Sequence, residues 1–256
     1  MVKEVLPWEG DESKVYSYPP APEHCIFFYP DHPIGAKKTG ESVFKLQPSC
    51  VVVGPQLTRV DLQLPNNHRA VMVAFQAGGL HRFLGIPMTE IFDQGFDGFD
   101  LMGPEVRFLL EELRETHLPE RVNERVQAFL FNKSKQIREI IPFDLAVRKL
   151  HHPVSAHSVD DVAREACLSV RQFQRKCHER LGMNPKLYAR IVRFSKAYRM
   201  FEDNRELTWS RISHSCGYFD QMHFIRDFKQ FAGLAPNDIR RKTELHPFKF
   251  QAPMDI

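Results

Sequence analysis

The sequence predicts an α+β protein with two domains, a β-rich domain with a helical appendage over residues 1–150 and an all-α domain over residues 151–256. Short apolar runs separated by Pro, Gly and Asn fill residues 25–75, and such runs are typical of strands. Residues 158–242 contain one pattern twice: a short helix, a turn, and a helix dense in Arg, Gln and His. Residues 151–157 are rich in His, Pro and Ser, which indicates a boundary between the two parts.

The bulk composition indicates a folded protein of the cell interior. Of the 256 residues, 43% are hydrophobic and 26% are charged, as in globular chains. No apolar run is as long as a membrane span, and residues 1–14 lack the apolar region of a signal peptide. The five scattered cysteines show no metal-ligand spacing. We therefore expect a soluble cytoplasmic protein with reduced thiols, without a membrane partner, a metal or a cofactor.

Charge is divided unevenly between the two parts. Residues 153–242 carry 17 Lys and Arg against 10 Asp and Glu, whereas the rest of the chain carries 18 against 22. A basic C-terminal part beside an acidic N-terminal part indicates that only the C-terminal part meets a polyanion such as nucleic acid.

The N-terminal part is expected to contain strands and then amphipathic helices. Residues 51–53 and 71–75 are continuous apolar runs, as in buried strands, and residues 60–64 alternate, as in a strand with one wet face. The expected helices span residues 88–94, 103–116, 121–132 and 143–150, with Phe108, Leu109 and Leu113 on one face of the second. Phenylalanines of this part either line an effector pocket or, more ordinarily, form the core: Phe27, Phe28, Phe75, Phe83, Phe92, Phe96 and Phe99.

The C-terminal part contains two helix-turn-helix units, residues 158–182 and 207–233. In such a unit a small residue is needed where the two helices approach, and Ala163 and Ser213 fill that position. The turn four residues later favours positive φ, which suits Gly217 better than Cys167. A helix that begins at Pro185 is expected to connect the units through one apolar stripe: Leu187, Ile191, Phe194, Tyr198 and Phe201.

The second helix of each unit is expected to bury one face and present the other to DNA. The buried residues would be Val170, Phe173 and Cys177 in the first unit, and Phe224 and Phe228 in the second. The outward residues would be Arg171, Gln172, Gln174, Arg175 and Lys176, and then Gln221, Met222, His223, Ile225, Arg226 and Lys229. Arg matches guanine and Gln matches adenine in the major groove. The apolar Met222 and Ile225 would either read thymine methyl groups or only position the protein.

The C-terminal region resembles the DNA-binding domain of AraC-type (AraC/XylS) transcriptional regulators. The resemblance covers about a third of the chain and is carried by DVAREACLSVRQFQRKCHERLGMNPKLYARIVRFSKA and ISHSCGYFDQMHFIRDFKQFAGLAPNDIRR. It implies base-reading roles for Arg171, Gln174 and Arg175 in the first unit, and for Gln221, Met222, Ile225 and Arg226 in the second. This sequence departs from the family pattern in a turn at Cys167 and a cap at Ala235, and at two packing positions, Cys177 and Ile239, where an aromatic residue is usual. The N-terminal half resembles a less characterised class of sensor domain, through VVVGPQLTRVDLQL, VMVAFQAGGLHRFLGIPMTEI and DLMGP.

These observations predict a sequence-specific regulator that binds double-stranded promoter DNA with two recognition helices in successive major-groove segments. Phosphate contacts are expected from Lys176, Lys186, Arg190, Lys229 and Arg240. A small-molecule effector on the N-terminal domain, RNA polymerase and a second copy of the chain are the further partners considered. The alternatives are a ligand-independent DNA binder whose N-terminal domain only oligomerises, and a ligand-binding or catalytic β-domain with subsidiary DNA binding. The histidines form no triad or metal spacing, so we expect no enzyme.

Overall fold

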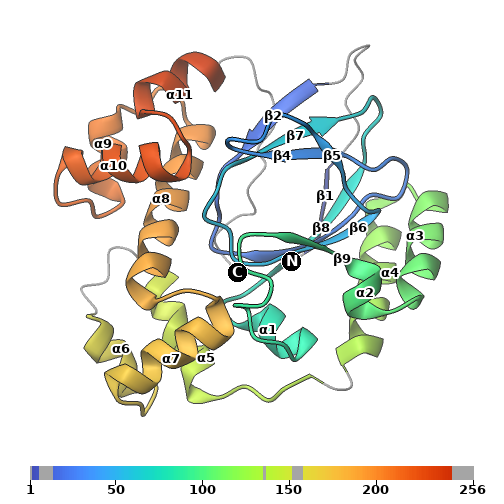
Figure 1. The fold of residues 1–256 in the computed structure, drawn as a ribbon, viewed down its shortest axis with the longest axis horizontal. Coiled ribbons are helices and arrows are strands. Elements are labelled where there is room, and N and C mark those ends of the chain that lie inside the picture. Colours follow the sequence, from blue (N-terminus) through green and yellow to red (C-terminus); the bar gives the residue numbers. More distant parts are fainter. Residues whose placement is uncertain (1, 6–13, 135–136, 152–157, 244–256) are drawn as a thin grey trace.

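The computed structural model describes residues 2–5, 14–134, 137–151 and 158–243. A β-rich part is followed by a helical part, and the two lie side by side (Figure 1). Most of the predicted boundary stretch, residues 152–157, lies outside the described residues, so the boundary after residue 150 stays a prediction. No helix within the described ranges is long and apolar enough to cross a membrane.

The strands form two antiparallel sheets. The first sheet consists, in spatial order, of β1 (Val2–Val5), β8 (Ala70–Phe75), β3 (His24–Phe28), β6 (Cys50–Val53) and β9 (Gly95–Asp97). The second sheet consists of β2 (Lys14–Tyr18), β7 (Val60–Leu64), β4 (Gly35–Lys38) and β5 (Lys45–Leu46). The buried strands predicted at residues 51–53 and 71–75 are confirmed, because β6 and β8 are almost wholly buried.

Helices cover one face of the first sheet, the face that points away from the second sheet. They are α1 (Gly79–Leu84), α2 (Gly98–Met102), α3 (Glu105–Glu115) and α4 (Pro119–Lys133). Because side chains alternate along a strand, Ile26 and Phe28 of β3 pack into the core beneath these helices, whereas Phe27 points to the opposite face. The helices expected at 103–116 and 121–132 are confirmed. Phe108, predicted to share a face with Leu109 and Leu113, is 67% exposed, whereas those two leucines are buried together with Val106 and Leu110.

The helix predicted over residues 88–94 is wrong, since this segment is a series of turns. Two of its amides bond to distant segments, and the amide of Glu90 donates to the carbonyl of Pro87 in a local turn at 3.1 Å. The amide of Met88 donates to the carbonyl of Glu179 at 2.8 Å, and the amide of Asp93 donates to the carbonyl of Pro55 at 2.7 Å. Asp93 also has a positive φ of 52°, which ends any helical run.

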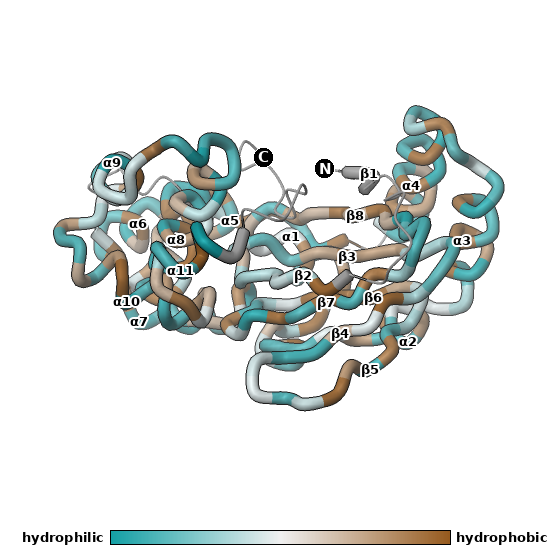
Figure 2. The backbone as a smooth tube through the Cα atoms, turned by 90° about the horizontal axis from the view of Figure 1, so that it is seen from above, coloured by the Kyte–Doolittle hydropathy of each residue, from teal (hydrophilic) through white to brown (hydrophobic). Residues whose placement is uncertain are grey.

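The helical part gathers at the opposite end of the molecule from α3 and α4, with strands between them (Figure 2). It consists of α6 (Val159–Glu165), α7 (Val170–Leu181), α8 (Pro185–Asp203), α9 (Trp209–Ser215), α10 (Gln221–Phe231) and α11 (Pro236–Thr243). The predicted helix at 143–150 is split into α5 (Pro142–Ala146) and the 3-10 helix η2 (Val147–His151). Both elements pack in the core of the helical part, where the rings of Phe143 and Phe173 lie 5.2 Å apart.

Buried ion pairs join elements that are distant in the sequence. Arg180 of α7 contacts Asp144 of α5 at 2.7 Å, and both side chains are buried. Arg199 of α8 contacts Glu23, just before β3, at 2.8 Å. Removing one partner of a buried pair leaves an uncompensated charge, which costs about 3–5 kcal/mol. The Arg199–Glu23 pair therefore fixes the helical part against the β-rich part, and the Arg180–Asp144 pair holds α5 against α7 within the helical part.

The turns of the two helix-turn-helix units have the same hydrogen bonds. In the first unit Cys167 N donates to Arg164 O and Leu168 N donates to Ala163 O, each at 3.0 Å. In the second, the equivalent bonds run from Gly217 to His214 at 3.0 Å and from Tyr218 to Ser213 at 3.1 Å. This pair of hydrogen bonds is typical of a helix that ends at a residue in the left-handed conformation. The φ values are 54° at Cys167 and 69° at Gly217.

Replacing Cys167 by Gly should stabilise the protein by roughly 0.5–1 kcal/mol, because a non-Gly residue is strained in the left-handed region. The change in free energy of unfolding is measured by urea denaturation. Cys167→Ala is the control, since it removes the thiol and keeps the strain. Equal stability of the Gly and Ala variants would contradict this explanation.

Acid should destabilise the β-rich part through two buried histidines. Burial lowers the pKa of His24 and of His68 to about 4, from an ordinary value of 6.5. Their stabilising effect is therefore complete above pH 6.5 and declines as the pH falls toward 4, by about 1.4 kcal/mol per pH unit for each histidine. Urea denaturation at pH 7 and pH 5 measures the difference in the free energy of unfolding. This difference should be smaller in the His24→Gln, His68→Gln double variant. Equal stability of the original chain at both pH values would contradict the prediction.

Candidate nucleic-acid interface

The first unit presents a polar face on α7. Ser169 caps this helix: its hydroxyl accepts from the amide of Gln172 at 3.3 Å, and the Gln172 side-chain oxygen accepts from the Ser169 amide at 2.9 Å. Gln172, predicted to face DNA, is exposed but its side-chain oxygen serves this cap. The predicted outward residues Arg171, Gln174 and Arg175 are all exposed.

Two predictions for α7 need correction. Val170, predicted to be buried with Phe173 and Cys177, is 37% exposed, because it is the first residue of the helix and lies before the first buried turn. Phe173 and Cys177 are fully buried, as predicted. Lys176 is half-buried and bonds to Glu179 at 2.8 Å, so its ammonium group has a partner within its own helix.

The second unit presents a more apolar face on α10. Asp220 caps the helix by accepting from the amide of His223 at 2.7 Å, and Phe224 and Phe228 are buried as predicted. The predicted outward residues Gln221, Met222, Arg226 and Lys229 are exposed, and Met222 is 67% exposed. Ile225 was predicted to face outward, but it is only partly exposed because it packs against the helical core.

Phe219 is an exposed residue that sequence reasoning missed, and its side chain is 98% exposed. The second turn has two residues between the left-handed Gly217 and the cap Asp220, whereas the first turn has only Leu168 between Cys167 and Ser169. Tyr218 is buried and its hydroxyl donates to Asp227 at 3.2 Å, so the additional residue, Phe219, is left in solvent beside the start of α10. Comparing the lengths of the two turns would have identified it.

The connector α8 holds both recognition helices. Its predicted stripe is confirmed, because Ile191, Phe194, Tyr198 and Phe201 are buried and Leu187 is partly buried. The ring of Phe194 lies 5.0 Å from that of Phe228 and 5.3 Å from that of Phe231, both on α10.

Two predicted phosphate contacts instead stabilise this packing. Arg190 of α8 contacts the buried Asp227 at 2.7 Å. Arg240 donates to the carbonyls of Arg205 and Leu207 and lies over the ring of Trp209 at 5.0 Å. Both guanidinium groups are therefore engaged inside the protein, whereas Lys186 and Lys229 are exposed.

The interface is electropositive because its cations are not neutralised. Within the described ranges, no acidic side chain pairs with Arg171, Arg175, Arg226 or Lys229. Unpaired guanidinium and ammonium groups on an exposed helix face attract phosphates and can donate to base edges. The described residues contain no group of three His, Cys, Asp or Glu placed to hold a metal ion.

A second candidate site is a cavity of about 350 Å³ between the two sheets. Of the seven phenylalanines considered for an effector pocket, only Phe27 lines it. Phe92 packs against the helical core, and the others pack in the core beneath α1–α4: Phe28, Phe75, Phe83, Phe96 and Phe99. The cavity lining also includes Lys37, Lys38 and Lys45, which sequence reasoning did not select because three dispersed lysines carry no motif.

Comparison with known proteins agrees with this geometry. A family model described as a helix-turn-helix domain matches residues 162–242, and one described as a domain of unknown function (DUF6597) matches residues 4–97. The HTH-type transcriptional activator RhaS of Escherichia coli (strain SE11) is 30% identical over 82 residues. That match covers 32% of this chain and 29% of RhaS. The chain thus spans less than a third of the length of RhaS, which is named as a transcriptional activator.

Solved structures of ToxT from Vibrio cholerae share the whole fold. ToxT of strain O395 aligns with a TM-score of 0.52 at 11% identity, over 94% of this chain and 97% of that chain. Unsaturated fatty acid bound ToxT of strain SCE256 aligns with a TM-score of 0.52 at 12% identity, over 98% and 96%. At these identities the likeness shows the fold alone. The helix-turn-helix family match spans residues 162–242, which include α7 and α10, and the solved structures share the two-domain fold.

Proposed function

We propose that this chain is a sequence-specific DNA-binding transcriptional regulator that places α7 and α10 in two successive major-groove segments of a promoter. The observation that carries the proposal is the pair of capped helices on one connector, each with exposed cationic and amide side chains. Recognition helices about 34 Å apart would reach one face of the duplex, one helical turn apart.

The two helix-turn-helix units, which we call the first and second heads, would read DNA by different chemistry. In the first, Arg171, Gln174 and Arg175 have the long polar side chains that bond in pairs to guanine or adenine. In the second, Gln221 and Arg226 are the polar readers. Lys186 and Lys229 would contact phosphates, and such contacts position a protein without specifying sequence.

Phe219 and Met222 give the second head an apolar surface at the start of α10. Residues at this end of a recognition helix are the ones that reach base edges. Thymine is the base that displays a methyl group in the major groove, and apolar side chains distinguish it. We therefore assign to this surface a preference for thymine.

The N-terminal domain would bind a small-molecule effector, and the regulator would act in the cytoplasm. The cavity between the sheets has the size typical of ligand sites, which favours this function over a domain that serves only for oligomerisation. ToxT, which shares the fold, has a structure with bound unsaturated fatty acid. RNA polymerase and a second copy of the chain remain proposed partners.

Selection of bound duplexes from a random pool by the full-length chain tests the central function. The proposal expects one enriched motif, bound with an affinity that falls steeply as salt rises, because phosphate contacts release counterions. Failure to enrich any sequence would contradict it.

Arg175→Ala should weaken binding to the selected duplex by roughly 1–3 kcal/mol and relax the preference at one base pair, if the contact is bidentate. Binding is measured by gel shift on duplexes that vary at each position. Arg125→Ala, at an exposed arginine of α4, is the control and should have no effect. A uniform loss on all sequences would make Arg175 a phosphate contact.

Substituting deoxyuracil for thymine should weaken binding at the positions read by Phe219 and Met222, because uracil lacks only the methyl group. The loss should disappear in the Phe219→Ser, Met222→Ser variant, which has no apolar surface to lose. Phe131→Ser, at an exposed phenylalanine of α4, should respond to uracil like the original chain. If uracil is tolerated at every thymine of the site, this part of the proposal is wrong.

A further inference from the structure

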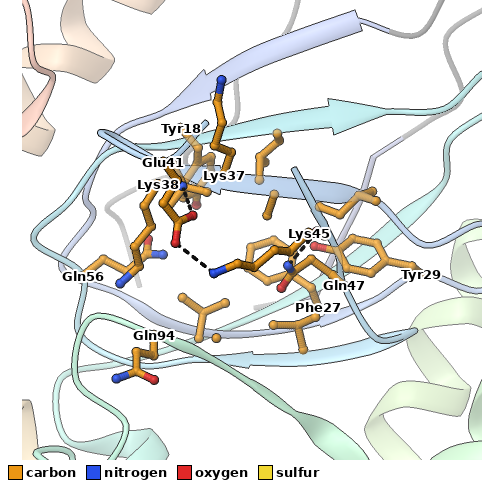
Figure 3. Close-up of a pocket in the computed structure, with 17 residues that line it drawn as sticks. Tyr18, Phe27, Tyr29, Lys37, Lys38, Glu41, Lys45, Gln47, Gln56 and Gln94 are labelled. Carbon is orange, nitrogen blue, oxygen red and sulfur yellow. Dashed lines mark hydrogen bonds and ion pairs between the residues drawn. The ribbon is translucent and has the colours of Figure 1, made fainter. Parts of the chain in front are cut away.

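The cavity between the sheets combines an apolar floor with a cationic rim (Figure 3). On the floor, the rings of Phe27 and Tyr29 are stacked 6.2 Å apart, and Tyr18 meets Phe27 edge-on at 6.5 Å. Val51, Val53, Val60 and Leu62 complete an apolar lining suited to a hydrocarbon or aromatic body.

The rim carries three lysines but only one carboxylate. Glu41 is the acidic residue of the lining, and it is already bonded to Lys45 Nζ at 2.9 Å and to the amide of Lys38 at 3.0 Å. Lys37 lies over the ring of Phe44 at 4.6 Å. Lys45 is thus balanced by Glu41, and Lys38 is balanced by Asp93, which lies outside the lining, so the lining itself carries two more cations than anions. This arrangement favours a ligand with a negative group.

Lys38 connects the cavity to Asp93, a residue outside its lining. Its ammonium group contacts Asp93 Oδ2 at 3.2 Å and also bonds to the Asp93 carbonyl, and both side chains are half-buried. Burial acts to raise the pKa of Asp93, but hydrogen bonds from Leu57 and Thr58 and the charge of Lys38 outweigh it, so the pKa lies below its ordinary value. Asp93 is therefore an anion with Lys38 as its counterion.

Asp93 in turn fixes residues 55–59, which we call the coupling segment. Asp93 Oδ1 accepts from the amides of Leu57 at 2.8 Å and Thr58 at 3.0 Å, and Oδ2 accepts from the Thr58 hydroxyl at 2.9 Å. The Asp93 amide donates to the carbonyl of Pro55 at 2.7 Å. Asp93 thus holds residues 55, 57 and 58 of the coupling segment, whereas Arg59 is held by hydrogen bonds from Thr39 and by an ion pair with Asp61 at 3.4 Å. Gln56 of this segment also lines the cavity.

The coupling segment touches the C-terminal ends of both recognition helices. At the end of α7, a Cβ on Gly182 would lie 2.4 Å from Pro55 Cγ, so only glycine fits there. At the end of α10, Arg59 donates to the carbonyl of the cap residue Ala232 at 3.2 Å. Any movement of the coupling segment therefore reaches α7 through Pro55 and α10 through Arg59.

From this chain of contacts we propose that the cavity binds a small organic anion with an apolar body, which takes Lys38 from Asp93 and so alters how the coupling segment holds α7 and α10. The DNA-binding consequence rests on the proposed function, whereas ligand binding does not. Lys38 and the apolar floor determine the ligand class. Asp93 is a positioning residue, because it acts through the coupling segment.

The binding arm uses probes that differ in charge. Calorimetry of the full-length chain with 3-phenylpropanoate and hexanoate should detect binding, and the neutral amides and cationic amines of the same carbon skeletons should bind at least about tenfold more weakly. Lys38→Met should reduce carboxylate binding by a similar factor. The control Lys133→Met removes a comparable half-buried lysine, paired with Glu105 at 3.1 Å outside the cavity lining, and should leave binding unchanged. If no carboxylate binds with dependence on Lys38, the assigned class is wrong.

The coupling arm measures the affinity of the full-length chain for its selected duplex. Saturating carboxylate, Lys38→Met and Asp93→Asn should each change that affinity in one direction, by about fivefold or more. The carboxylate should have no further effect on Lys38→Met. Asn tolerates the left-handed conformation of residue 93, so Asp93→Asn tests the charge in a folded protein, with thermal unfolding as the check.

The two arms separate failure of this inference from failure of the proposed function. If the chain binds no duplex, the proposed function is wrong, but calorimetry still shows whether the cavity binds carboxylates. If it binds DNA with the same affinity in the presence of bound carboxylate and in both variants, the coupling is wrong and the proposed function stands.

Discussion

The packing of α8 against both helix-turn-helix units is the interaction on which the rest of the structure depends. A recognition helix is useful only if its distance from the second one is fixed. Phe194 holds α10, because its buried ring contacts Phe228 and Phe231 there, and α7 shares the same buried cluster through Phe173, Cys177 and Leu181. Arg190 adds an ion pair to the buried Asp227. Close packing of such rings resists small displacements, so we expect α7, α8 and α10 to form one rigid body.

The β-rich part contacts α7 and α10 at their C-terminal ends, opposite to the helix starts that are proposed to read DNA. Pro55 lies against Gly182 and Arg59 bonds to Ala232. Ligand and DNA would therefore act on the same two helices from opposite ends, and neither would block the other. This geometry gives a physical reason for joining a sensor domain to a double reading head.

Sequence patterns predicted the features that depend on neighbours in the chain. Helical spacing identified the α8 stripe, and the repeated pattern identified the turn residues Cys167 and Gly217, whose φ values are positive. Features set by distant contacts were not predictable. The turns at residues 88–94 exist because their amides bond to other segments, and Arg190 is diverted from DNA by Asp227, 37 residues away. The lysines of the cavity come together only when β4 and β5 pair, as at Ala36 and Lys45.

Hydroxyl-radical footprinting of the full-length chain on its selected duplex tests the central claim most directly. Two rigidly connected heads predict two protected segments on one face of the duplex, about one helical turn apart. In the proposed function, the exposed polar side chains of α7 would contact one segment and those of α10 the other. A single protected segment that is unchanged by substitutions in α10 would contradict the account, because the second unit would then not contact DNA.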